Sequence, residues 1–229
     1  MFIKTKIILV HVCLILFSCS GINKKHTTDI SVNDTEIAEL EDSKVSDIVF
    51  PVDEYLKWVQ NPENGFRKNK EMAEINFSVQ FKPYEYIVCM EERTNEIADS
   101  LLKRKRTELE GVQYYDLKIS LTEKEGELLK YNLSSSDQYS KRVKYFAFEM
   151  QNDIQLVEGN DTLPCVLYHF ERTYDTSPSC TILLGFDMNL KSISKQKTLL
   201  VYDRTFNKGL LKFTFKENKF LNLPKLQTI

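Results

Sequence analysis

The side chains able to do metal or nucleophilic chemistry lie close together in this 229-residue chain. Cys165 and His169 are four residues apart, so they share one face of a predicted strand, and Cys180 falls on the next predicted strand. Two thiolates and an imidazole are ligands for zinc, and a cysteine beside a histidine base is a nucleophile. However, the chain has no C-x-x-C pair, no H-x-x-x-H pair and no glycine-flanked nucleophile. We therefore predict no metal, no cofactor and no catalytic residue.

Cys165 and Cys180 are also candidates for a disulfide. They are fifteen positions apart and flank two strand-like segments, which suits a bridge in an exported protein. The alternative is that both are buried thiols that pack as small hydrophobic side chains. The sequence leaves both interpretations open.

Carboxylates give a second catalytic hypothesis. The side chains of Asp161, Glu171, Asp175 and Asp203 fall near the ends of predicted strands, where a glycosidase would need two of them to converge. Acidic residues in turns are usually solvated, so this hypothesis is an alternative only. A periplasmic hydrolase using these carboxylates, or a cysteine with His169, requires them to cluster in one cleft.

Aromatic residues give a binding hypothesis. Most of the 14 phenylalanines and 11 tyrosines fall at alternating positions and are first explained as core. The candidates for exposed contact residues are Tyr84, Tyr114, Tyr115 and Tyr174. A second alternative function is therefore capture of a glycan or a peptide.

Residues 1–18 are typical of an export signal. Lys4 and Lys6 precede an apolar run at 7–17, which is too short to span a bilayer. The run ends in Leu16-Phe17-Ser18-Cys19, which resembles the lipobox of bacterial lipoprotein signal peptides. The resemblance implies that residues 1–18 are removed and that Cys19 carries the lipid. The alternative is an ordinary secretory signal cut elsewhere.

The same resemblance implies a location. Ser20 follows the cysteine, where an Asp would favour retention in the inner membrane, so we expect an outer-membrane lipoprotein that faces the periplasm. The lipid chains would attach the protein firmly without a transmembrane helix. The later sequence, rich in Lys, Asn, Phe and Tyr, resembles uncharacterised envelope lipoproteins of Bacteroidota-type bacteria, which implies no activity.

The net charge of the chain argues against nucleic acid as a partner. Removal of residues 1–18 leaves 29 basic and 33 acidic residues, a net charge near −4, which offers nothing to nucleic acid. Residues 19–49 are mostly polar and acidic, and we interpret them as a flexible tether. We predict a non-catalytic, lipid-anchored protein with a structural, assembly or binding role and an envelope protein partner.

Hydrophobic periodicity predicts an α+β fold in which N-terminal helices pack beside a C-terminal antiparallel β-sandwich-like sheet. We expect a helix-containing portion over 50–135 and an antiparallel β portion over 136–229. The predicted helices are 53–59, 84–110 with an interruption near Thr94, and a short helix within 122–131. The predicted strands are 73–81, 112–121, 143–150, 154–157, 162–174, 180–186, 198–202, 210–215 and 219–223.

Overall fold

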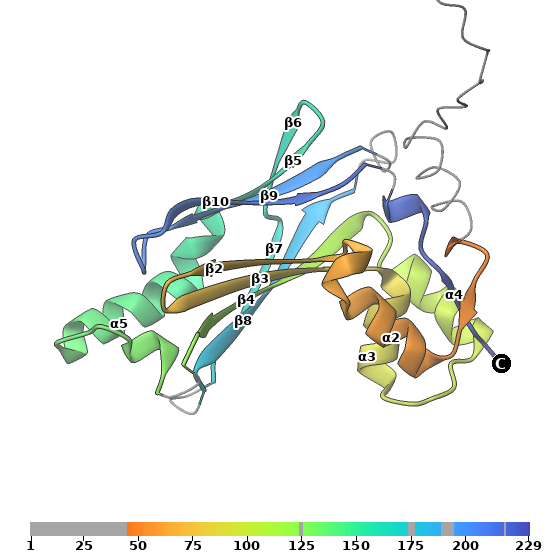
Figure 1. The fold of residues 1–229 in the computed structure, drawn as a ribbon, viewed down its shortest axis with the longest axis horizontal. Helices are drawn as coiled ribbons and strands as arrows, with labels where there is room; N and C mark the ends of the chain where they lie inside the picture. Colours follow the sequence, from red (N-terminus) through yellow and green to blue (C-terminus); the bar gives the residue numbers. More distant parts are fainter. Residues whose placement is uncertain (1–44, 124–125, 174–176, 189–194, 218) are drawn as a thin grey trace, which may run out of the picture.

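The computed structural model describes residues 45–123, 126–173, 177–188, 195–217 and 219–229 (Figure 1). The signal peptide, Cys19, most of the tether, Tyr174 and Asp175 lie outside this part of the chain. In the described residues the fold is sheet-rich α+β, and every pair of strands in its two larger sheets is antiparallel.

The larger sheet has five strands in the order β2-β3-β4-β8-β7. Their bounds are β2 (Arg67–Met72), β3 (Ile75–Lys82), β4 (Val112–Leu121), β8 (Ser179–Asp187) and β7 (Leu167–Glu171). Alternate side chains of β3, β4 and β8 are buried, because one face of the sheet covers the core. Strands from either side of residue 135 share this sheet, so the two predicted portions are structurally joined.

The second sheet has four strands in the order β10-β9-β5-β6. Their bounds are β10 (Gly209–Phe215), β9 (Lys197–Asp203), β5 (Ile154–Glu158) and β6 (Asp161–Pro164). Aromatic contacts join the two sheets, since the ring centroids of Tyr115 on β4 and Phe215 on β10 are 5.5 Å apart.

Three helices lie in the first half of the described chain, namely α2 (Val52–Gln60), α3 (Tyr84–Glu92) and α4 (Asp99–Glu108). The helix predicted over 84–110 is therefore two helices, and the interruption expected near Thr94 is confirmed. Helix α3 ends at Arg93, which adopts a left-handed conformation with φ of 53°. The Thr94 hydroxyl then donates a hydrogen bond to the Glu96 carbonyl, which holds the connection in a turn.

The two ends of the described chain meet in a third, two-stranded sheet. Strand β1 (Val49–Phe50) runs parallel to β11 (Lys225–Leu226). The backbone N–H of Lys225 donates to the Ile48 carbonyl, and that of Gln227 donates to the Phe50 carbonyl, each at 2.8 Å. We call this pair the β1–β11 clasp.

The predicted strand over 143–150 is wrong, because the start of the expected β portion, 136–149, is helical. Helix α5 (Ser136–Lys144) continues into a π-helix, η3 (Tyr145–Glu149), and a 3₁₀ turn, η4 (Met150–Asp153). The Ser135 hydroxyl starts α5 by accepting from the Gln138 N–H. Tyr139, Val143, Phe146 and Met150 then follow one helical face that packs on the core.

Other segments differ in extent from the prediction. The strand predicted over 162–174 is divided into β6 and β7, which belong to different sheets. The segment 219–223 contains a 3₁₀ turn, η6 (Lys219–Leu221), rather than a strand, and the described part of 122–131 contains only the 3₁₀ turn η2 (Leu128–Lys130). Strand β2 was not predicted.

Candidate binding pocket

A pocket of about 410 Å³ lies where the C-terminal segment crosses the ends of the strands. Its walls come from the end of β3, the start of β4, the first turn of α3, the end of α4 and the segment that leads into β11. The lining is mainly apolar and aromatic, with charged groups among the rings. The lining residues are Phe81, Lys82, Pro83, Tyr84, Glu85, Arg106, Leu109, Glu110, Val112, Gln113, Tyr114, Met188, Lys197, Phe220, Leu223, Pro224 and Lys225.

Two of the tyrosines predicted to bind a ligand meet in this pocket. Tyr84 is the first residue of α3 and Tyr114 lies near the start of β4, and both side chains are half-buried. The Arg106 guanidinium from α4 lies 5.6 Å from the centroid of the Tyr84 ring. Burial, reinforced by the nearby Glu85 carboxylate, raises the pKa of Tyr84 to about 12, so its hydroxyl stays protonated and can donate a hydrogen bond.

The prediction for Tyr115 is wrong. Because successive side chains of a strand point to opposite faces, Tyr115 points into the core while Tyr114 faces the pocket. Tyr115 is fully buried, and its hydroxyl donates a 3.2 Å hydrogen bond to Oε1 of Gln113. Tyr174, the fourth candidate, lies outside the described residues.

Lys197, one of the lining residues, belongs to a buried ion pair. Nζ of Lys197 on β9 contacts Oε1 of Glu158 on β5, and their side chains are only 2% and 1% exposed. Nε2 of Gln113 lies 3.4 Å from the same Glu158 oxygen and donates to the Asp187 carbonyl at 3.0 Å. Burial lowers the pKa of the Lys197 ammonium, and the adjacent carboxylate opposes that effect by favouring the charged form.

Phe220 covers this pair from the C-terminal segment. Its ring centroid lies 5.0 Å from Nζ of Lys197 and 4.7 Å from the Phe81 ring centroid. Sequence reasoning missed both Lys197 and Glu158. The sequence did contain a signal, because each of these charged residues takes a buried position in a strand whose other buried positions are apolar. In β5 the buried positions are Ile154, Leu156 and Glu158, and in β9 they include Lys197, Leu199 and Val201.

The disulfide between Cys165 and Cys180 is not formed. Both thiols are free and buried, as is the thiol of Cys89. The N–H of Val166, next to Cys165, donates to Gly185, which lies five residues along β8 from Cys180. Five residues of strand span about 17 Å, whereas bridged cysteines have Cα atoms within about 7 Å. The buried-thiol alternative describes these residues.

The catalytic candidates in the described residues are divided between the two larger sheets. His169 and Glu171 lie on β7 of the larger sheet, whereas Asp161 and Asp203 belong to the smaller one. Asp203 is buried and accepts hydrogen bonds from the backbone N–H groups of Thr205, Phe206 and Lys208, so it holds a turn. Among the described residues, no three His, Cys, Asp or Glu side chains are grouped to hold a metal ion.

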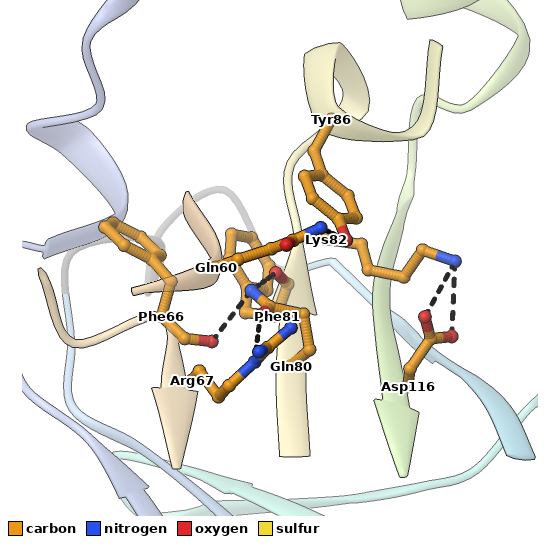
Figure 2. Close-up of polar contacts among 8 residues, drawn as sticks. All are labelled: Gln60, Phe66, Arg67, Gln80, Phe81, Lys82, Tyr86 and Asp116. Atoms are coloured by element: carbon orange, nitrogen blue, oxygen red, sulfur yellow. Dashed lines mark hydrogen bonds and ion pairs between the residues drawn. The ribbon is translucent and has the colours of Figure 1, made fainter. Parts of the chain in front are cut away.

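A second polar cluster joins α2 and α3 to the larger sheet (Figure 2). Nε2 of Gln80 on β3 lies 3.2 Å from the Val59 carbonyl of α2, and its Oε1 accepts from Arg67 of β2 at 2.9 Å. Nearby, Nζ of Lys82 lies 3.1 Å from a carboxylate oxygen of Asp116. These contacts attach α2 to the sheet and fix Lys82, which also lines the pocket.

No helix in the described residues has both the length and the apolar character needed to cross a membrane. Comparison of the chain with models of protein families, with curated proteins and with solved structures found no match.

Proposed function

We propose that this protein is a non-catalytic, lipid-anchored envelope protein that binds a small ligand in the pocket described above. The observation that carries the proposal is the convergence of Tyr84 and Tyr114, from separate elements, on one concave and mainly apolar site. Binding sites for small molecules commonly combine such a lining with a few fixed polar groups. In this proposal a sandwich-like pair of sheets, with the N-terminal helices beside it, is the scaffold that holds the pocket.

The ligand is the first element to test. Ligand-observed NMR with mixtures of small organic molecules would compare the wild type with Leu223→Trp, in which a larger ring fills part of the pocket. Lys141→Trp, at an exposed position of α5, is the matched control. We expect binding signals that Leu223→Trp abolishes and Lys141→Trp preserves. Signals that survive equally in all three proteins would contradict the proposal.

The proposed location at the outer membrane rests on the N-terminal signal sequence. The lipobox-like sequence supports attachment through Cys19 to the outer membrane, on the periplasmic side, and an acidic tether would let the domain reach an envelope protein partner. We expect Cys19→Ala to move the protein from the membrane fraction to the soluble fraction. Retention of this variant in the membrane would contradict the anchor. Crosslinking in intact cells, followed by identification of captured proteins, tests the partner.

A hydrolase is the weaker proposal, because its candidate carboxylates and His169 are divided between two sheets. A glycan or peptide capture protein is closer to the proposed function, since its aromatic contacts could be supplied by the same two tyrosines. The ligand mixtures should therefore include short peptides and saccharides.

A further inference from the structure

A group of lysines lies where the edges of the two larger sheets meet. Strand β2 is an edge of the five-stranded sheet, and β10 is an edge of the four-stranded sheet. Nζ of Lys68 lies 6.0 Å from the centroid of the Phe215 ring, and Nζ of Lys70 lies 6.0 Å from that of the Phe213 ring. Both rings are buried, so these two ammonium groups cover the core where the sheets approach each other.

Two lysines of the C-terminal segment extend this group. Lys216 directly follows β10, and Lys219 is the first residue of η6. A Cβ placed on Gly65 would lie 3.9 Å from Nζ of Lys68 and 4.0 Å from Cδ of Lys219, so these two side chains are neighbours. Burial, together with the charges of Lys216 and Lys219, lowers the pKa of Lys68. We call Lys68, Lys70, Lys216 and Lys219 the seam lysines.

Three of the seam lysines have no paired carboxylate in the described part of the chain. These are Lys68, Lys70 and Lys216, and the exposed Glu217 beside them is also unpaired among the same residues. Lysines on an edge strand discourage pairing with other chains, which accounts for Lys68 and Lys70. That role does not account for the two lysines that approach from the C-terminal segment. Together the four charges favour an anionic partner.

The chain itself carries an acidic segment within reach of the seam lysines. Residues 29–42 contain six carboxylates and no lysine or arginine, and the six are Asp29, Asp34, Glu36, Glu39, Glu41 and Asp42. The chain then enters the domain through β1, where a carboxylate oxygen of Asp47 lies 3.8 Å from Nζ of Lys225. Lys219 is six residues from Lys225, which is at most about 22 Å. Five residues of extended chain ahead of Asp47 already span about 17 Å, so the acidic segment can reach the seam lysines.

We propose that residues 29–42 dock on the seam lysines and hold the proposed tether against the domain. Single ion pairs at a surface are weak and are screened by salt, so the docking depends on several carboxylates and lysines acting together. Docking leaves only residues 19–28 free, which shortens the root-mean-square reach of the tether from about 30 Å to about 17 Å by coil scaling. The domain is then held close to its anchor until salt or a competing surface releases the segment. This inference does not depend on the pocket or its ligand.

Double electron–electron resonance on the full chain, purified with its lipid anchor in detergent, tests the docking. Spin labels at Asn33→Cys in the acidic segment and at Asn69→Cys on β2 report the distance between the two sites. Asn69 is exposed, whereas the native cysteines of the described residues are buried and should not react. We expect one narrow distance distribution at low salt. At 1 M salt the distribution should widen, because the Debye length falls to about 3 Å.

Two double variants assign the effect to particular lysines. Lys68→Gln/Lys216→Gln should widen the distance distribution at least about two-fold, towards that of a free coil. Lys141→Gln/Lys144→Gln, which removes two exposed lysines of α5, is the matched control and should leave the distribution unchanged. Circular dichroism verifies the fold of each variant.

Three outcomes would overturn the inference. The first is a distribution of the same width in the wild type and in Lys68→Gln/Lys216→Gln. The second is a short distance that disappears when labelled protein is diluted with unlabelled protein, because the segment would then dock on a second copy. The third is a broad distribution together with flotation of the Cys19→Ala chain on phosphatidylglycerol vesicles that Lys68→Gln/Lys216→Gln abolishes, which would assign the seam lysines to a membrane surface.

Discussion

Replacing Glu158 with alanine leaves the ammonium of Lys197 buried without its counter-charge. Both side chains are at least 98% buried, so the ammonium has little contact with solvent that could compensate for the lost carboxylate. Breaking one partner of a buried ion pair costs about 3–5 kcal/mol of stability, which is a large part of the total for a small domain. The double variant Lys197→Met/Glu158→Leu removes both charges and should be neutral, or more stable than the wild type by about 1–4 kcal/mol.

Urea unfolding provides the assay, because the single tryptophan, Trp58, lies half-buried with its ring 5.5 Å from that of Phe66 and reports on the folded state. Lys141→Ala, which breaks the exposed pair with Asp137, is the control and should leave the midpoint almost unchanged. The reasoning fails if Glu158→Ala unfolds at the wild-type midpoint, or if the double variant is as unstable as the single one.

Three further predictions concern stability. Gly185→Ala places a Cβ 2.8 Å from Cβ of Leu167, so we expect a loss of about 1–3 kcal/mol in urea unfolding; an unchanged midpoint would show that the strands are not this close. Burial raises the pKa of the Cys180 thiol to about 12, so above pH 9 the unfolded chain ionises first and the free energy of unfolding falls, by up to about 1.4 kcal/mol per pH unit. Cys180→Ala should show a shallower fall, and an identical pH dependence would contradict the burial of this thiol. Lys225→Pro removes the N–H that donates to Ile48 and should cost about 0.5–1.5 kcal/mol, with faster proteolysis of the C-terminal segment as a second readout; wild-type stability and proteolysis together would refute this role of the clasp.

The strands with regular alternation could be predicted from the sequence. Buried and more exposed side chains alternate along the full length of β4, and the same alternation of apolar and polar residues can be recognised in the sequence. The segment 143–150 was misassigned because it alternates over a few residues. Its helical spacing becomes clear only when Tyr139, which precedes the segment, is included. The Ser135 cap was a local signal that favoured the helix.

Strand β2 was missed for a different reason. Four of its six residues are charged, which is typical of an edge strand that must avoid pairing with other chains, and such a sequence resembles a loop. The division of 162–174 reflects Pro164, which ends β6 because it has no N–H for a ladder. A single-sequence pattern cannot show that the chain changes sheets at that point.

The pocket could be predicted only in part. Tyr84 and Tyr114 were identified by residue type, but their place in one pocket depends on the tertiary arrangement of α3 and β4, which periodicity does not encode. The Lys197–Glu158 pair depends on the register of β5 with β9, in which these two residues are direct partners. Register is set by all the inward side chains together, so no local signal specifies it.

The β1–β11 clasp gives the fold a mechanical property. Chain ahead of residue 45 enters the domain through β1, and β1 is held to β11 by a short ladder. A pull on that incoming chain therefore loads this ladder first. Because Leu223, Pro224 and Lys225 belong to the same segment and line the pocket, tension at the N-terminal end would reach the pocket wall before it reached either large sheet.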